Sequence, residues 1–191
     1  AWPSPDPGRP RRIGAGSGRL RLDGSGMMGG NRCSLDDRRI VDSVLRDFPS
    51  LCLCLRQRRE YLESLARSGG ADCGRIQGGT SIPAQERVLL ALTSDVEYCE
   101  LSAVVEVISG ALGDLSESMY AVVDGLFFRH LSLQEICEKH NCGEKWIRIR
   151  RSLSYDVLSG PVFRVYPVVR RWRSREQARR EEALRLLCHC G

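Results

Sequence analysis

Residues 131–151 read LSLQEICEKHNCGEKWIRIRR, the pattern of two helices joined by a tight turn. Ser132 and Glu135 have the spacing of a capping box, in which each side chain bonds the backbone N–H of the other residue and fixes a helix start. Asn141 and Gly143 tolerate the backbone angles of a turn. The second helix then carries Lys145, Arg148, Arg150 and Arg151. The stretch therefore predicts a helix-turn-helix whose second helix suits an electronegative groove.

The sequence around this stretch carries a wider pattern. It consists of Leu115-Ser116-Glu117, Val122-Val123, Leu126-Phe127-Phe128, Leu131 to Ile136, and Trp146-Ile147-Arg148. This pattern resembles sigma factor region four and the phage late transcriptional regulators of the RinA and ArpU-like group. Such regulators tend to have leucine, a branched aliphatic residue and serine where this chain has His140, Cys142 and Gly143. The resemblance covers about a quarter of the chain and implies DNA binding by a sigma-like helix-turn-helix.

Charge is divided along the chain. The net charge is +5, but residues 84–142 hold 3 basic and 10 acidic residues, whereas residues 143–191 hold 12 basic and 5 acidic residues. The positive segment begins where the second helix of the motif begins. This favours nucleic-acid contact, because local potential attracts a phosphate backbone more than total charge does. A solvated C-terminal helix is the alternative interpretation.

Composition limits the class of protein. A chain of 191 residues with 42% hydrophobic residues can build one ordinary core or two small ones, and no run has the 18 or more apolar residues of a membrane span. The first residues lack the apolar stretch of a signal peptide, so secretion is not expected. The nine cysteines are odd in number and mostly embedded in helical patterns. They indicate reduced thiols and a cytoplasmic location.

We expect an all-α protein with four parts. Residues 1–30 are rich in Gly, Pro, Ser and Arg, and we expect a disordered tail because such a composition cannot offset its ordering entropy. Residues 31–112 are expected to form a helical region with a flexible joint at 68–83. Residues 113–160 are the predicted helix-turn-helix DNA-binding domain, and residues 161–191 are a basic C-terminal helical extension.

Apolar spacing predicts the individual helices. One begins at Ser34, and the others cover 84–111, 115–128, 144–158 and 170–188. The triplet Ser159-Gly160-Pro161 is expected to end the recognition helix, and residues 162–169 are expected to be extended. The helix over 84–111 has two apolar stripes, which implies partners on both sides, a homodimer included. One stripe is Leu89, Leu92, Val96, Cys99, Ala103 and Val107, and the other is Leu101, Val104, Val105 and Ile108.

The buried face of the recognition helix has two interpretations. The resemblance implies that Ile147, Ser154, Tyr155 and Leu158 lie inside. Spacing alone also accepts Trp146, Ile149, Leu153 and Val157 as inward residues.

The candidate DNA-contacting residues are mostly basic. They are Glu144, Lys145, Arg148, Arg150, Arg151, Ser152, Arg170, Arg171 and Arg173. Arg148 is the best candidate for bidentate hydrogen bonding to guanine, and Glu144 is a candidate acceptor from cytosine. Lys145, Arg151 and the later arginines are expected to contact phosphates.

Other chemistry is weakly indicated. Cys52 and Cys54 point about 200° apart on a helix, so core packing explains them better than a shared metal. The terminal Cys188-His189-Cys190 lacks a second ligand pair at zinc-finger spacing. No glycine-rich phosphate loop or catalytic constellation occurs. We therefore expect no enzyme activity, no cofactor and no metal.

The function predicted from these patterns and the resemblance is transcriptional regulation by sequence-specific DNA binding. Double-stranded DNA is the expected partner, RNA polymerase is a second candidate, and no membrane partner is expected. Two alternatives stay open: a phage DNA-packaging recognition subunit, and a helical adaptor that binds no nucleic acid.

Overall fold

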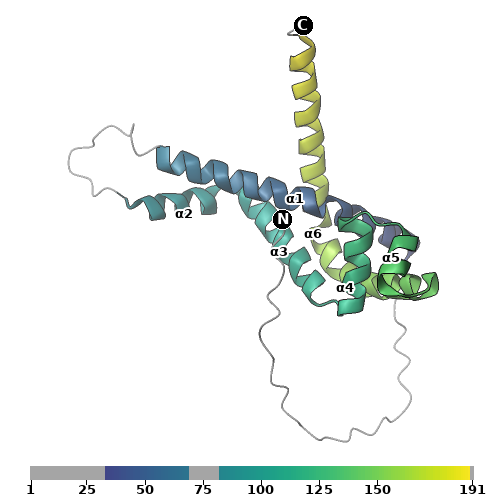
Figure 1. Cartoon of the computed structure of the whole chain (residues 1–191). Coiled ribbons are helices and arrows are strands. Elements are labelled where there is room, and N and C mark those ends of the chain that lie inside the picture. The colour runs from purple at the N-terminus through teal and green to yellow at the C-terminus, as the bar shows by residue number, and fades with distance from the viewer. Residues whose placement is uncertain (1–32, 69–81, 190–191) are drawn as a thin grey trace, which may run out of the picture. The chain divides into compact units, whose positions relative to one another are not determined.

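The computed structural model describes residues 33–68 and 82–189, and within these ranges the chain is all-α, as predicted (Figure 1). The elements are α1 (Leu35–Ser68), α2 (Ala84–Ser94), α3 (Val96–Gly113), α4 (Glu117–Val123), the π-helical segment η1 (Asp124–Phe128), α5 (Leu133–His140) and α6 (Glu144–His189). The tail predicted over 1–30 and nearly all of the joint predicted over 68–83 lie outside the described residues.

Helix α1 begins where the sequence predicts. The Oγ atom of Ser34 accepts a hydrogen bond from the backbone N–H of Asp37 at 3.1 Å, and the Asp37 carboxylate accepts one from the Ser34 N–H at 2.9 Å. These reciprocal bonds satisfy two donors that a helix start leaves without partners.

The single helix predicted over 84–111 is wrong, because the chain breaks at Asp95. Asp95 has an extended backbone, and its carboxylate caps α3 by accepting a hydrogen bond from the N–H of Tyr98 at 2.7 Å. The same carboxylate accepts two hydrogen bonds from Arg58 of α1, at 3.1 and 2.6 Å. A cap held by a partner on another helix stabilises the break.

The predicted end of the recognition helix at Ser159-Gly160-Pro161 is also wrong. Helix α6 has 46 residues and contains both Pro161 and Pro167, so the extended piece over 162–169 and the separate helix over 170–188 do not form. Val162, Val165, Val169 and Trp172 recur at helical spacing and are all buried. Burial of this stripe offsets the cost of about 3 kcal/mol that proline imposes inside a helix.

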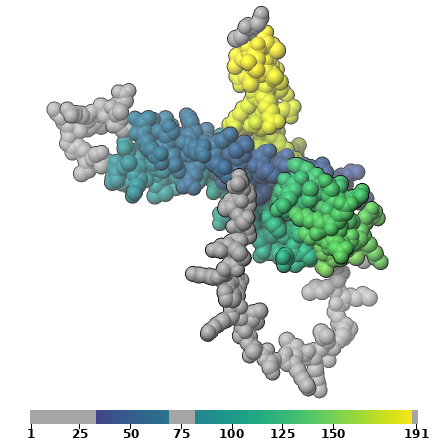
Figure 2. Space-filling model, in the orientation of Figure 1, coloured from purple at the N-terminus to yellow at the C-terminus, as the bar shows by residue number. Residues whose placement is uncertain are grey.

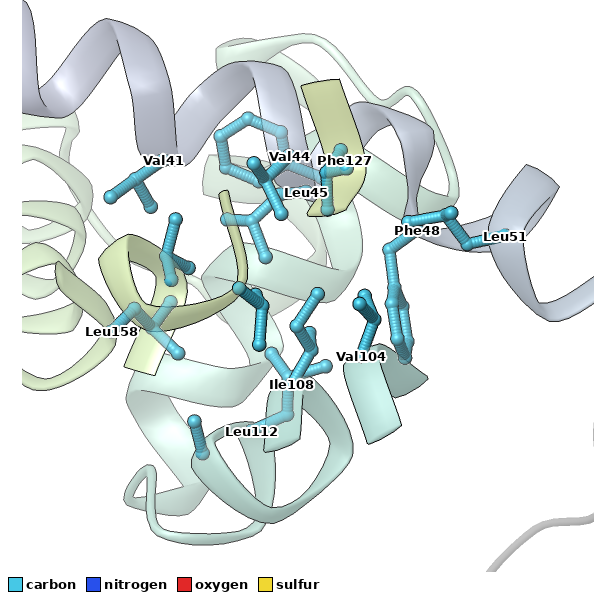
Figure 3. Packing of buried hydrophobic residues seen from close by; sticks show 14 of the residues in the cluster. Val41, Val44, Leu45, Phe48, Leu51, Val104, Ile108, Leu112, Phe127 and Leu158 are labelled. Atoms are coloured by element: carbon cyan, nitrogen blue, oxygen red, sulfur yellow. The ribbon is translucent and has the colours of Figure 1, made fainter. Parts of the chain in front are cut away.

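The main core joins α1, α3, α4, η1 and α6 (Figure 3). In Figure 3, Val44, Leu45 and Phe48 of α1 lie in this cluster with Ile108 of α3 and Leu158 of α6. The core also contains Val162, Val165, Val169 and Trp172 of α6. Described residues from each of the predicted parts 31–112, 113–160 and 161–191 therefore contribute to this main core.

Some apolar surface in the described part stays exposed. Leu89, Val96, Cys99 and Ala103, from one predicted stripe of the 84–111 segment, are exposed, whereas Leu101, Val104 and Ile108 from the other are buried. Residues 177–188 of α6 are exposed, and this end of the helix stands away from the other helices (Figure 2). No helix in the described ranges is both long and apolar enough to cross a membrane.

Candidate nucleic-acid interface

The α5–α6 unit consists of α5, the turn over 141–143 and the first turns of α6. Its start is fixed by the predicted capping box: Ser132 Oγ accepts from the Glu135 N–H at 3.3 Å, and the Glu135 carboxylate accepts from the Ser132 N–H at 2.7 Å. The Ser132 hydrogen bonds hold the pKa of Glu135 below its ordinary value. Glu135 is therefore ionised at neutral pH, where its charge also suits the positive end of the α5 dipole.

The turn depends on a left-handed residue. Asn141 has φ 47° and ψ 50°, a conformation that asparagine tolerates better than most residues. The carbonyl of Cys137 accepts a hydrogen bond from the N–H of Cys142 at 3.0 Å, which closes the end of α5. The turn prediction over 141–143 is thus confirmed as local geometry.

A small second core sets the position of α6 against α5. It consists of Val122 of α4, Ile136 of α5 and Ile147 of α6, all fully buried. Gly125 of η1 packs against it so closely that a Cβ atom there would lie 2.9 Å from Cδ1 of Ile136. A larger residue at position 125 would require the Ile136 side chain to shift, and no local pattern in the sequence indicates this close approach.

The buried face of α6 follows the resemblance. Ile147, Ser154, Tyr155 and Leu158 are buried, whereas Ile149, Leu153 and Val157 are exposed and Trp146 is half-buried. The opposite assignment from spacing is therefore wrong for three of its four residues.

The predicted base-reading residues lie in solvent. Glu144, Lys145 and Arg148 are exposed, and Arg148 Nη2 donates to the Glu144 carboxylate at 2.8 Å. The Arg148 side chain is 72% exposed and that of Glu144 is 58% exposed. An exposed pair of this kind contributes only about 0–1 kcal/mol. Arg148 can therefore leave Glu144 for another acceptor at low cost.

Arg150 and Arg151 are held by the protein instead. The Arg150 guanidinium lies 5.5 Å from the centre of the Trp146 ring. Arg151 donates to Asp42 of α1 at 2.8 Å and to the Tyr155 hydroxyl at 2.5 Å. Tyr155 also donates to Asp42, at 2.5 Å, and burial together with this hydrogen bond raises the pKa of the tyrosine. Arg151 therefore links α6 to α1.

The later arginines of α6 pair with acids from other helices. Glu100 of α3 accepts from Arg171 and from Arg175, each at 2.8 Å, and these bonds lower the pKa of Glu100. Arg173 pairs with Asp47 of α1, and Arg179 pairs with Glu97 at 2.8 Å. Arg170 is exposed. The structure thus brings Glu144, Lys145 and Arg148 together but places Arg170, Arg171 and Arg173 elsewhere on the same helix.

Sequence reasoning missed two residues of α1 near the first turns of α6. Ser152 Oγ accepts a long hydrogen bond from Arg38 at 3.5 Å, and the Arg38 guanidinium lies 5.6 Å from the centre of the Tyr155 ring. Arg39 lines the same pocket as Arg38, Arg148 and Ser152. Arg38 and Arg39 lie more than 100 positions before Arg148 and Ser152 in the sequence, so no local pattern indicates that these parts of α1 and α6 meet.

Among the described cysteines, Cys33, Cys52, Cys54, Cys137 and Cys142 pack against one of the two cores, whereas Cys99 and Cys188 are exposed. Cys52 and Cys54 pack against the main core, and burial raises the pKa of Cys52 to about 11. Within the described ranges, no group of three His, Cys, Asp or Glu side chains is placed to hold a metal ion. Cys188 is exposed, whereas the His189 side chain and Cys190 lie outside the described residues.

Comparison of the chain with protein-family models, curated proteins and solved structures finds no match. The resemblance to sigma region four and to the RinA and ArpU-like regulators stays a prediction that rests on the residues quoted above.

Proposed function

We propose that this protein binds double-stranded DNA through the outer face of the first turns of α6 and regulates transcription. One observation carries the proposal: Lys145 and Arg148 are exposed at the start of a helix that a capped partner helix and a dedicated small core hold in place. A helix presented in this way fits the major groove, where arginine can read guanine through two hydrogen bonds.

The proposal divides the candidate residues by role. Arg148 is the proposed base contact, Glu144 its partner in the free protein and a candidate acceptor from cytosine, and Lys145 a phosphate contact. Arg151 has a structural role through Asp42. The base-reading surface that we propose is therefore smaller than the set of basic residues in α6.

Selection of bound duplexes from a random library tests the proposal. Arg148→Ala should relax preference at one base position by about 1–3 kcal/mol, because a bidentate contact to guanine is lost. Arg180→Ala is a matched control: its side chain is also 72% exposed on α6 and pairs with a glutamate four residues earlier, Glu176, at 3.2 Å. We expect the control to leave base preference unchanged. Equal profiles for wild type and Arg148→Ala would remove Arg148 from the reading role.

A helical adaptor is the second candidate function, and one observation favours it. Ile149, Leu153 and Val157 form an exposed apolar stripe beside the basic residues of α6. Such a stripe suits a protein partner, RNA polymerase included, better than a groove lined by phosphates. Absence of binding to any duplex at low salt would favour the adaptor, because phosphate contacts are strongest there.

The packaging-subunit alternative differs in its assembly. Measurement of molar mass by light scattering during size exclusion separates the two: a ring of many copies favours packaging, and a monomer or homodimer favours regulation. The exposed face of α2, which has no buried residue, supports self-association as a property to measure.

A further inference from the structure

We propose that a pocket between the N-terminal turns of α1 and the first turns of α6 binds a phosphate group. This inference rests on the proposed function, since the group we assign to the pocket is a backbone phosphodiester of the DNA that α6 reads. The pocket has a volume of about 420 Å³. It is lined by Leu35, Arg38, Arg39 and Asp42 of α1 and by Arg148, Arg151, Ser152 and Tyr155 of α6.

The acidic side chain that lines the pocket is already paired within the protein. Asp42, the one acidic residue that lines the pocket, accepts hydrogen bonds from both Arg151 and Tyr155. Its charge is therefore already matched by Arg151. Asp42 therefore does not neutralise the positive charge of Arg38, Arg39 or Arg148, the other arginines that line the pocket.

The acids that pair with two of these arginines hold them weakly. Arg39 pairs with Asp36 at 3.2 Å, with both side chains more than 80% exposed, and Arg148 pairs with Glu144 in solvent. Neither acid lines the pocket. Exposed pairs contribute about 0–1 kcal/mol, so an anion with several acceptor oxygens can compete for both arginines.

Arg38 is oriented for this role. Its guanidinium lies over the Tyr155 ring, 5.6 Å from the ring centre, and its Nη2 donates a long hydrogen bond to Ser152 at 3.5 Å. Its buried Nε has no hydrogen-bond partner in the described part of the chain. A buried donor without an acceptor is costly. A planar guanidinium held by an aromatic ring and short of acceptors matches the oxygens of a phosphate.

The location of the pocket indicates the source of the phosphate. Arg148 lines the pocket and is also the proposed base contact, so an anion bound there lies beside the reading residue. In DNA complexes, phosphate contacts next to a recognition helix fix its register without reading sequence. We assign this positioning role to Arg38.

Salt-dependent binding of the full chain to a selected duplex and to a random duplex tests the assignment. Arg38→Gln should weaken both complexes, reduce the slope of log K against log salt by roughly 0.9 and leave base preference unchanged. Arg46 is an exposed arginine farther along α1. The control variant Arg46→Gln should leave both the affinity and the salt slope unchanged. Thermal unfolding of each variant separates a loss of binding from a loss of folding.

A second arm identifies the phosphodiester. Single phosphates of the selected duplex are replaced in turn by neutral methylphosphonates. One replacement should weaken duplex binding by the wild-type protein but not by Arg38→Gln, because the variant has already lost the contact between Arg38 and that phosphate. If wild type binds the duplex and Arg38→Gln keeps its affinity, salt slope and full sensitivity to every replacement, the pocket assignment is overturned while the proposed function stands.

A third arm separates the two proposals. Binding of inorganic phosphate is followed by the NMR signal of the Arg38 Nε–H in wild type and Arg148→Ala. Saturable phosphate binding by a protein that binds no duplex would overturn both the phosphodiester assignment and the proposed function, and would identify a free phosphate compound as the ligand. Absence of both phosphate and duplex binding would overturn both proposals entirely.

Discussion

The first turns of α6 and its later half carry arginines at similar density but surround them differently. Near the start, Arg148 makes one exposed pair within its own helix. In the later half, Arg171 and Arg175 share Glu100, Arg173 pairs with Asp47, and Arg179 pairs with Glu97. The same residue type therefore offers charge to solvent at Arg148 and joins helices at Arg171, Arg173, Arg175 and Arg179.

This difference changes the meaning of the charge division along the chain. Glu97 and Glu100 belong to the acidic segment 84–142. Their arginine partners belong to the basic segment 143–191. Part of the positive charge is thus matched inside the fold. The phosphate contacts predicted for Arg170, Arg171 and Arg173 stay a prediction, and the first turns of α6 remain the better candidate for DNA.

Truncation after Gly160, which removes the later half of α6, should have the largest effect on the stability of the fold. It removes Val162, Val165, Val169 and Trp172, whose burial stabilises the fold by about 1.5–3 kcal/mol for each side chain. Their sum is comparable with the whole stability of a typical domain, about 5–15 kcal/mol. We expect residues 1–160 to show no cooperative transition in urea, followed by far-ultraviolet circular dichroism.

Truncation after Arg180 is the control. It removes the exposed Leu184, Leu186 and Leu187 but keeps the arginines that pair with α1 and α3. The free energy of unfolding should change by less than about 0.5 kcal/mol. A cooperative transition in the 1–160 chain would show that the later half of α6 is an appendage, as the sequence predicted, and not part of the core.

Arg151→Gln should show that Arg151, although it lies in the first turns of α6, joins helices as the arginines of the later half do. Its loss removes hydrogen bonds to Asp42 and Tyr155, and hydrogen bonds to charged groups contribute about 1.5–3 kcal/mol. We expect the free energy of unfolding to fall by that amount while base preference is kept. Arg148→Gln should do the reverse, with stability within about 0.5 kcal/mol of wild type. Loss of base preference in Arg151→Gln, at unchanged stability, would contradict the division.

Local signals predicted the parts of the fold that depend on local chemistry. The helix start at Ser34, the capping box at Ser132 and the turn at Asn141 follow from side chains within three residues of the backbone groups that they bond. The inner face of α6 near Ile147 followed from the resemblance, because spacing alone accepted two faces. These features could be predicted before the tertiary structure was known.

Features that depend on distant partners could not be predicted. Proline and glycine at 159–161 indicate a helix end, but burial of Val162 and Trp172 by α1 and α3 outweighs that signal. The break at Asp95 needs Arg58, 37 residues earlier. The pocket at Arg38 needs Ser152, 114 residues later. Sequence periodicity reports one helix at a time and carries no information on which helices meet.

Glu100→Gln should have the smallest effect and tests the later half directly. Glu100 accepts from both Arg171 and Arg175, and partly exposed pairs contribute about 0.2–1 kcal/mol each. We therefore expect a modest loss of stability at pH 7. Glu106→Gln, an exposed glutamate on the same helix, is the matched control and should cause less.

The change of this stability loss with pH tests whether Glu100 is ionically paired. The two arginines hold the pKa of Glu100 below its ordinary value in the folded protein, so the unfolded chain takes up the proton first as pH falls. The contribution of Glu100 is fully present above the unfolded pKa and disappears as pH falls through the folded pKa. The difference in unfolding free energy between wild type and Glu100→Gln should therefore narrow from pH 7 towards pH 3. A difference that is constant with pH would mean that Glu100 is not ionically paired. A steeper salt dependence of duplex binding in Glu100→Gln than in Glu106→Gln would support Arg171 as a DNA-contacting residue and would add Arg175 to that set.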